Sequence, residues 1–325
     1  MMTTMRLPDG RDVQAIDLAN GRMTARVLTL GAIVQDLRMT GVDHPLVLGC
    51  PDISNYLDEG MYIGALVGRC ANRIAGASIC MDGQRHDLDA NFRGRHTLHG
   101  GHDGTAVHIW QVQDCQTDHV TLGLTLPDGH MGFPGEISIS ARIALQDDGL
   151  VIDISATTDR ATPCNIVHHG YFDLDGQGDI SRHRLKVNAA RYLPVDDDLI
   201  PLGHPATVSE TAFDFRQSRI LGDLAVDHNF CLQDAKTIRQ VARLHGENGL
   251  SMVVETDAVG LQVYNGAHFS GLRGLGGRIY GPRAGLALET QAWPGAVGRP
   301  DFPDVILRRD DTYHHHMAYR FSQTA

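Results

Sequence analysis

Long apolar segments are missing from this sequence of 325 residues. No uninterrupted apolar run approaches the roughly 20 residues that a membrane-spanning helix needs. The first residues, Met1 to Gly10, also lack the apolar core of a signal peptide. We therefore expect a cytoplasmic protein without a membrane segment.

Positive charge is scarce as well. Only 28 Lys and Arg residues stand against 39 Asp and Glu residues, and the formal net charge at pH 7 is −11. A surface that binds nucleic acid or an anionic membrane needs a basic patch to neutralise phosphates. The composition therefore argues against both of these partners.

Several motifs of cofactor and covalent chemistry are absent. The sequence contains no nucleophile elbow, no phosphate-binding glycine loop and no dinucleotide fingerprint, so we expect no cofactor. It also contains no Cys-x-x-Cys pair. In a chain without an export signal, scattered cysteines are expected to be reduced and mostly buried; they are Cys50, Cys70, Cys80, Cys115, Cys164 and Cys231.

A sustained helical period of apolar residues is almost absent, and short β-like runs take its place. They recur at intervals of about 8–12 residues, which is typical of a sandwich or barrel. The 36 glycines supply the turns that such a fold needs. Without a linker or repeat, the chain is predicted to be one all-β domain over residues 1–325. The predicted strands include 23–30, 31–39, 46–49, 120–126, 136–145, 150–156, 251–256, 260–264 and 313–321, with helical turns near 53–56 and 210–213.

The most informative stretch is Leu286 to Gly295, in which small and apolar residues lead directly to Glu289. Pro294 cannot continue a strand ladder, so the pattern predicts a buried strand that presents Glu289 at the rim of a sheet. A carboxylate in apolar surroundings has a raised pKa unless a partner neutralises it. A rim glutamate in a salt bridge is the simpler interpretation of this stretch alone.

Four polar clusters lie in turn-rich segments, and none is specific by itself. The histidine groups 96/99/102 and 314–316 are candidate metal ligands, since His is a common ligand of zinc. The first group lacks an obvious carboxylate, and strand alternation separates neighbours in the second. We therefore expect no catalytic metal. The clusters are Gly68–Ile74, Arg95–Gly101, Asn165–Leu174 and Val226–Phe230.

Taken together and in order, these motifs resemble the aldose 1-epimerase (galactose mutarotase) family. The matching segments run from about residue 70 to Gln291, which is most of the chain. They are Asn72-Arg73-Ile74, Leu98-His99-Gly100-Gly101, Asp128-Gly129, Gly132-Phe133-Pro134-Gly135, His169 before Tyr171-Phe172, Leu199-Ile200-Pro201, Phe213-Asp214-Phe215-Arg216, Asp227-His228-Asn229-Phe230, Gln262-Val263-Tyr264 and Glu289-Thr290-Gln291.

The resemblance implies a large antiparallel β-sandwich of the galactose-mutarotase type with a sugar-binding cleft. It also implies that Glu289 is the general base and His169 the general acid of a reaction that needs no cofactor or metal. The residues that match the family's sugar-binding positions are Asn72, Arg73, His99, Asp227 and Gln262.

The chain departs from the family pattern beside the proposed acid. The usual Asn-His-Ser-Tyr-Phe is His168-His169-Gly170-Tyr171-Phe172 here, and Asp173 replaces the usual Asn. The match to Tyr-Phe assigns the acid to His169, and strand alternation would turn His168 away from the cleft. Asp173 or Asp227 is the candidate carboxylate that supports the imidazolium.

The implied activity is the interconversion of the α- and β-anomers of a free aldose such as galactose or glucose. Three alternatives remain at this point: a non-catalytic carbohydrate-binding or sugar-sensing sandwich, a relative that acts on sugar phosphates, and a metal-dependent β-sandwich enzyme. The protein is expected to be a monomer or homodimer, and the preferred aldose is not determined.

Overall fold

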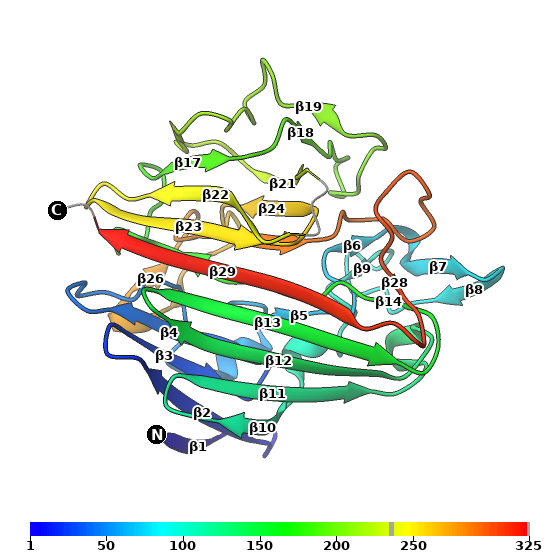
Figure 1. Cartoon of the computed structure of the whole chain (residues 1–325), viewed down its shortest axis with the longest axis horizontal. Coiled ribbons are helices and arrows are strands. Elements are labelled where there is room, and N and C mark those ends of the chain that lie inside the picture. The colour runs from blue at the N-terminus through cyan, green and yellow to red at the C-terminus, as the bar shows by residue number, and fades with distance from the viewer. Residues whose placement is uncertain (234–236, 324–325) are drawn as a thin grey trace.

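Antiparallel strands make up almost all of the regular structure. The computed structural model describes residues 1–233 and 237–323 (Figure 1). Among these residues there is no α-helix, which confirms the predicted all-β class. The predicted turn of helix near residue 53 is confirmed, whereas residues 210–213 are not helical. The short 3-10 turns are η1 (Ile53–Leu57), η2 (Ala75–Ala77), η3 (Thr105–Val107), η4 (His130–Gly132) and η5 (Leu275–Gly277).

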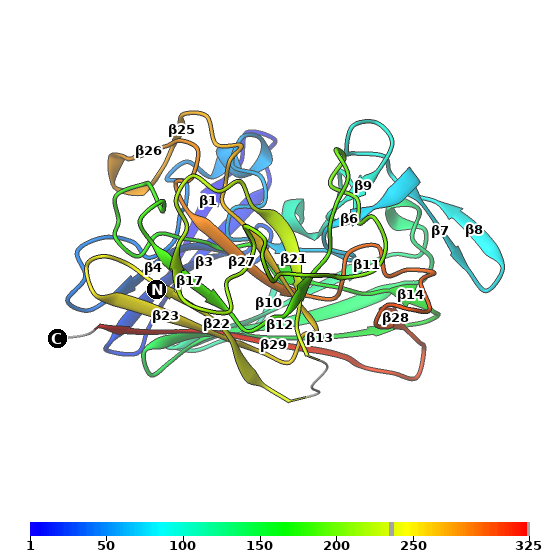
Figure 2. The ribbon, with the colours of Figure 1, turned by 90° about the horizontal axis from the view of Figure 1, so that it is seen from above.

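A nine-stranded sheet forms one broad side of the molecule (Figures 1 and 2). The C-terminal strand β29 lies in its middle, between β13 and β23. Segments from both halves of the chain therefore share one sheet. In spatial order its strands are β10 (Gln111–Cys115), β11 (His119–Leu126), β12 (Ile137–Gln146), β13 (Gly149–Thr158), β29 (Tyr313–Gln323), β23 (Leu250–Thr256), β22 (Arg239–His245), β17 (Arg184–Val187) and β20 (Arg219–Ile220).

A six-stranded sheet packs on the inner face of the nine-stranded one. Strands β27 and β24 lie inside this sheet, so both have hydrogen-bonded neighbours on each side. The order is β16 (Tyr171–Phe172), β27 (Leu286–Gln291), β24 (Gly260–Tyr264), β21 (Asp227–Cys231), β18 (Arg191–Tyr192) and β19 (Ala206–Thr207).

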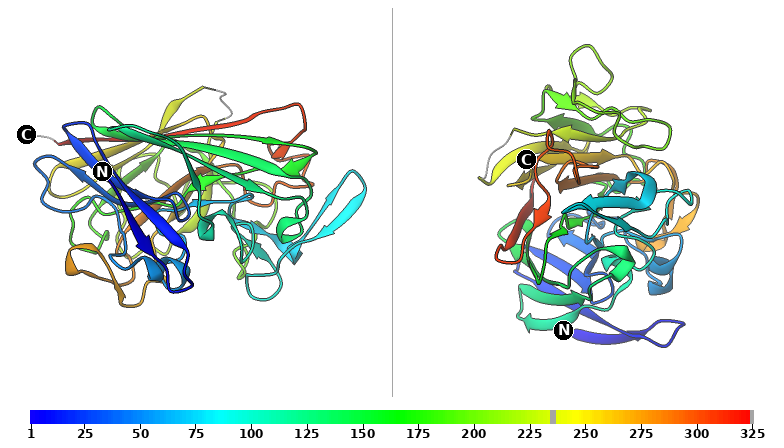
Figure 3. Two further views of the ribbon diagram at one scale, coloured as in Figure 1. Left: turned by 90° about the horizontal axis from the view of Figure 1, so that it is seen from below. Right: turned by 90° about the vertical axis from the view of Figure 1, so that its right-hand side faces the viewer.

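The N-terminal region adds a four-stranded meander, and the described residues also form five short strand pairs, of which the hairpin of residues 78–87 extends outward from the body of the molecule (Figure 3). The meander is β1 (Met2–Arg6), β2 (Asp12–Ala19), β3 (Met23–Leu28) and β4 (Ile33–Met39). The pairs are β5 (Leu66–Val67) with β15 (Val167–His168), β6 (Arg73–Ile74) with β9 (Thr97–Leu98), β7 (Ser78–Met81) with β8 (Gln84–Asp87), β14 (Thr162–Pro163) with β28 (Ile306–Leu307), and β25 (Leu272–Arg273) with β26 (Ile279–Tyr280).

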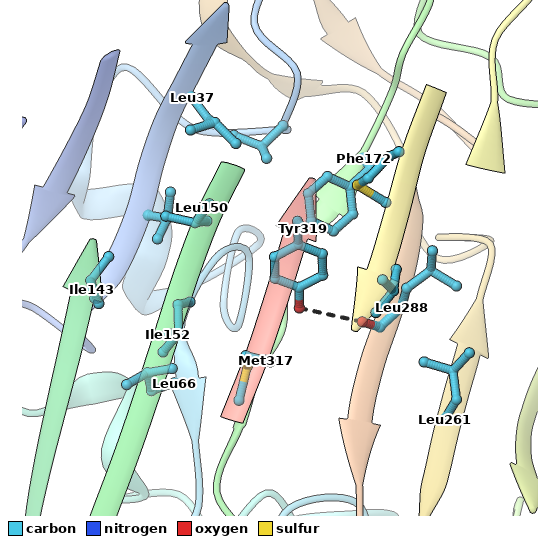
Figure 4. Packing of buried hydrophobic residues seen from close by; sticks show 14 of the residues in the cluster. Leu37, Leu66, Ile143, Leu150, Ile152, Phe172, Leu261, Leu288, Met317 and Tyr319 are labelled. Carbon is cyan, nitrogen blue, oxygen red and sulfur yellow. Dashed lines mark hydrogen bonds between the residues drawn. The ribbon is translucent and has the colours of Figure 1, made fainter. Parts of the chain in front are cut away.

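The main apolar core lies between the sheets. Figure 4 shows Tyr319 of β29 beside Phe172 and Leu288, and the Tyr319 hydroxyl donates to the Leu288 carbonyl oxygen at 3.4 Å. The same buried cluster includes Ile152 of β13 and Leu261 of β24. Since one continuous cluster joins both sheets, we propose that the chain forms one domain.

Most long strands lie where alternation and turn residues predict them. β12 and β13 form a hairpin, with Gln146 opposite Gly149 and therefore Asp147 and Asp148 in the turn. The predicted strand at 46–49 is wrong, because only an isolated bridge from Val47 to Phe172 forms there. No helix among residues 1–233 and 237–323 is long and apolar enough to cross a membrane.

Candidate active site

Glu289 lies inside the six-stranded sheet and not at its rim as the sequence predicted. β27 is an interior strand of the sheet, and Glu289 faces Gln262 of the neighbouring strand β24 directly across the ladder. Its side chain is buried. Alternation sends the neighbours Leu288 and Thr290 to the opposite face, where they meet the nine-stranded sheet. The carboxyl group therefore lies on the free face of the inner sheet, within the fold.

His169 reaches the same place from the connection between β15 and β16. Its backbone N–H donates to the Ala65 carbonyl at 2.8 Å, and its carbonyl accepts from Gly64 at 2.9 Å. The preceding residue, His168, points the other way, with its Nδ1 3.3 Å from the Tyr319 hydroxyl. A Cβ atom on Gly170 would lie 2.4 Å from the His168 ring. The His168 ring therefore packs in the space that a side chain at position 170 would need, and this space is free because residue 170 is glycine.

The carboxyl group and the imidazole form a buried pair. His169 Nε2 lies 3.5 Å from Glu289 Oε1, and both side chains are almost fully enclosed. Burial raises the pKa of Glu289 to about 8, with Asp227 acting in the same direction and Arg73 against it. Burial lowers the pKa of His169 to about 3. Both shifts favour the neutral forms, because a charge loses water contacts here.

His99 lies on the other side of this pair. It follows β9 with a φ of 51°, and its ring meets the His169 ring edge-on at a centroid distance of 5.3 Å. The Asn72 backbone N–H donates to His99 Nδ1 at 3.2 Å, so neutral His99 carries its proton on Nε2. Burial, assisted by His169 and Arg73, holds the pKa of His99 well below its usual range. His99 is thus a fixed hydrogen-bond donor.

A polar network extends the site across the sheet. Arg73 of β6 lies 3.4 Å from the Asp227 carboxylate, and Gln262 donates to the same carboxylate at 2.5 Å. The Asn72 side chain accepts from the Arg73 backbone at 2.9 Å. All seven residues that the sequence analysis selected thus lie in one connected group around Glu289. Three of the buried polar atoms without a protein partner belong to it: Arg73 Nε, His169 Nδ1 and Glu289 Oε2.

Neither candidate for the supporting carboxylate contacts His169. Asp173 is buried elsewhere, where it accepts from the backbone of Gly176 and Gly178 and faces His183 at 3.7 Å. Asp227 is held by Arg73 and Gln262. The carboxyl group beside the imidazole is Glu289 itself.

Two aromatic residues at the site escaped sequence analysis. The Tyr62 ring stacks on His169 at 6.3 Å and tilts against His99 at 4.7 Å. The Arg73 guanidinium lies over the Phe92 ring at 4.8 Å. The positive φ of Tyr62, 75°, directs its ring toward the site. A positive φ is uncommon for a residue other than glycine, and no local sequence pattern predicts it here.

Two loops meet over the polar network. Four residues of the segment 193–201 line the small cavity beside Arg73 and Asp227: Leu193, Val195, Leu199 and Pro201. Its volume is only about 10 Å³ for the centre of a water-sized sphere, which is room for about one water molecule. Asp198 in this segment is paired with Arg93 and Arg95 of the facing loop. This cavity alone is therefore too small for a pyranose.

Three side chains in the cleft lie close enough together to hold a metal ion, although the sequence predicts no metal site. His99, His169 and Glu289 each bring a potential ligand atom within 4.8 Å of the others. The Arg73 charge, however, lowers the pKa values of all three groups, which means that its field opposes a second cation there.

The histidine groups considered from the sequence do not assemble. His96 faces Asp198 and His102 faces Asp89. In the triplet 314–316, His315 is buried against Thr290 while His316 pairs with Asp153.

Comparison with known proteins gives a consistent result. The family model described as aldose 1-epimerase matches residues 14–320. Galactose mutarotase of Rattus norvegicus is 36% identical over 97% of this chain and 96% of its own length. Aldose 1-epimerase of Escherichia coli K12 is 32% identical over 97% and 96%.

Two solved structures share the whole fold. An aldose epimerase homologue from C. elegans has a TM-score of 0.90 and 29% identity over 96% of this chain and 99% of that one. Galactose 1-epimerase from Lactobacillus acidophilus has a TM-score of 0.86 and 28% identity over 100% and 99%. These likenesses confirm the predicted sandwich of the galactose-mutarotase type.

Proposed function

The chain belongs to the aldose 1-epimerase family, and we propose that its Glu289–His169 pair interconverts the α- and β-anomers of a free aldohexose such as galactose or glucose. The observation that carries the assignment of the pair is its geometry. One carboxyl group and one imidazole, 3.5 Å apart and buried, face a set of hydrogen-bonding side chains. Binding alone requires no matched acid and base, so a non-catalytic sugar-binding protein is not favoured.

The reaction needs one proton removed and one supplied. Glu289 takes the proton of the C1 hydroxyl while His169 donates a proton to the ring oxygen O5, and the C1–O5 bond breaks to give the open-chain aldehyde. Rotation about C1–C2 presents the other face of the carbonyl carbon. O5 then attacks C1, returning its proton to His169, while Glu289 gives its proton to the new C1 oxygen. Each group alternates between acid and base.

The shifted pKa values suit a pair that holds one proton between its two members. Between about pH 3 and pH 8 the free site has Glu289 protonated and His169 neutral. Moving that proton from Glu289 to His169 gives the base and the acid that the ring-opening step requires. Because the proton stays within the pair, the transfer changes no net charge in the cleft.

The surrounding polar residues would hold the sugar. Arg73 offers a planar guanidinium suited to neighbouring hydroxyl groups, and Asp227 and Gln262 lie at its side. The hydrogen bond that His99 Nδ1 accepts from the Asn72 backbone leaves the ring proton on Nε2, from which His99 can donate to the sugar. We assign these five side chains to substrate binding because they all converge on the face that Glu289 occupies.

Polarimetry on freshly dissolved α-D-galactose and α-D-glucose tests the proposed activity. The protein should speed relaxation of the rotation to the same final value, and the relative rates would rank the two sugars. The Glu289→Ala variant, which keeps the sugar-binding residues, should relax at the rate of the buffer blank. Absence of acceleration by wild type on both hexoses and on pentoses would contradict the proposal.

The pH dependence should show a single alkaline limb. We expect kcat/KM to be constant through neutral pH and to fall above about pH 8, because the pair then loses its only proton. Asp227→Asn should move this limb to lower pH, since the Asp227 charge raises the pKa of Glu289. Initial polarimetric rates with the blank subtracted at each pH give the profile. A limb that moves to higher pH in Asp227→Asn would contradict the assignment to Glu289.

The cytoplasm is the proposed location. All six cysteines are free in the structure, and four of them are buried. Free thiols persist in a reducing compartment.

A further inference from the structure

A second group of ligating side chains lies outside the cleft. Asp103, His108 and His130 each bring one potential ligand atom within 4.8 Å of the others. His130 Nε2 lies 3.0 Å from one Asp103 carboxylate oxygen, and His108 Nε2 lies 3.3 Å from the other. The two imidazole rings meet edge-on at a centroid distance of 5.4 Å. Both histidines thus turn their Nε2 atoms toward Asp103, and His108 Nε2 also lies 3.1 Å from the Asp103 backbone carbonyl oxygen.

Asp103 and His108 flank η3, and buried contacts hold this turn in place. The Thr105 hydroxyl donates to the Leu66 carbonyl at 2.6 Å, and the Thr105 backbone N–H donates to Gly68 at 3.1 Å. The Trp110 indole donates to the Thr105 carbonyl at 3.1 Å. The spacing between the aspartate and the first histidine is therefore set by the core and does not depend on an ion.

His130 comes from a different loop, which is anchored separately. The buried guanidinium of Arg69 donates to the carbonyl oxygens of Pro127, Pro134 and Gly135 at 3.3, 3.1 and 2.7 Å. These bonds fix both ends of the loop that carries His130. Two rigid loops thus present their ligands to each other, which lowers the ordering cost of capturing an ion.

The donor set indicates the kind of ion. Two imidazoles and one carboxylate suit Zn²⁺ and similar transition metals, whereas Mg²⁺ and Ca²⁺ prefer oxygen ligands alone. The Asp103 side chain is about half exposed, so water can fill a fourth position. His130 Nδ1 has no partner among the described residues. Outer partners of ligating histidines typically improve affinity ten- to a hundredfold, so we expect weaker binding than at a site whose histidines all have such partners.

We propose that Asp103, His108 and His130 bind one divalent transition-metal ion, with Zn²⁺ as the best fit. The ion would join residues 99–108 to residues 127–135. His99 begins the first of these segments, so the ion would brace the loop that supplies a substrate-binding residue while staying outside the chemistry. Zn²⁺ is thus expected to raise the melting temperature, because it binds the folded chain.

Calorimetric titration of the full chain with ZnCl₂ tests the site, using protein without a histidine tag that was treated with EDTA and dialysed. We expect one equivalent to bind to wild type. Asp103→Asn and His130→Asn should each weaken binding at least tenfold and remove the melting-temperature increase caused by Zn²⁺. His316→Asn is the matched control, since it alters another surface His–Asp pair and should bind like wild type.

Two variants separate this site from the cleft. Glu289→Gln should retain the equivalent of Zn²⁺, because it changes only the group around His99 and His169. Binding that disappears in Glu289→Gln but persists in Asp103→Asn would overturn the proposal. So would the absence of saturable binding up to about 1 mM, or binding lost only in His316→Asn. These outcomes are independent of whether the protein accelerates mutarotation.

Discussion

Glu289→Gln is expected to lower kcat/KM for mutarotation by about 10²- to 10⁴-fold while making the protein more thermally stable. The loss of activity follows because an amide cannot exchange a proton with the C1 hydroxyl. Shape and hydrogen-bonding capacity change little. The neighbouring Gln262 and Asp227 keep their mutual bond, so sugar binding should be largely retained.

The gain in stability follows from the raised pKa. Glu289 ionises near its ordinary value of 4.5 when the chain is unfolded and only at about 8 when it is folded. Between these values the folded state binds more protons, so wild-type stability falls as the pH rises from 4.5 to 8. At pH 7 the cost is at most roughly 3 kcal/mol. The variant lacks this cost and should melt a few degrees higher.

Polarimetry and thermal unfolding of both proteins at pH 5 and pH 7.5 measure the two effects. The stability advantage of the variant should be larger at pH 7.5. Glu136→Gln is the control, because Glu136 is exposed and the change should alter neither activity nor stability measurably. An active Glu289→Gln variant would refute the assignment of the base, and an advantage that shrinks with rising pH would refute the origin of the stability difference.

His169→Gln and His168→Gln should separate catalysis from packing. His169→Gln is expected to lose about 10²- to 10⁴-fold in kcat/KM, since it removes the group that protonates O5. His168→Gln should keep kcat/KM within a few fold, because its ring faces Tyr319 and not the cleft. It should instead lower the stability by about 1–3 kcal/mol, since the buried Tyr319 hydroxyl loses one of its two partners and keeps only the Leu288 carbonyl oxygen.

Circular dichroism and thermal unfolding establish that each histidine variant is folded before its rates are compared by polarimetry. The His168 ring also fills the space beside Gly170. A double change, His168→Asn with Gly170→Ser, restores the usual residues of the family pattern at both positions and should recover part of the stability. The assignment of the acid would be wrong if His168→Gln, though folded, lost more activity than His169→Gln.

Local chemistry made much of the fold visible in the sequence. Alternating apolar residues with Gly and Asp turns located β12, β13, β23, β24 and β29 within one or two residues. The prediction of a strand at 46–49 was wrong because this apolar run forms only one isolated bridge and otherwise lies in a connection between strands. Alternation also separated His168 from His169, since each residue of an extended chain faces away from the next.

The sequence by itself thus determined the all-β class, the family and the residues that surround Glu289. Only the tertiary structure decided that Glu289 lies inside a sheet, that Asp173 belongs to another network and that Tyr62 covers two histidines. It also decided that Asp103, His108 and His130 converge. The reason is physical: strand period and turn chemistry act over a few residues, whereas desolvation and contacts between distant loops depend on how every strand is paired.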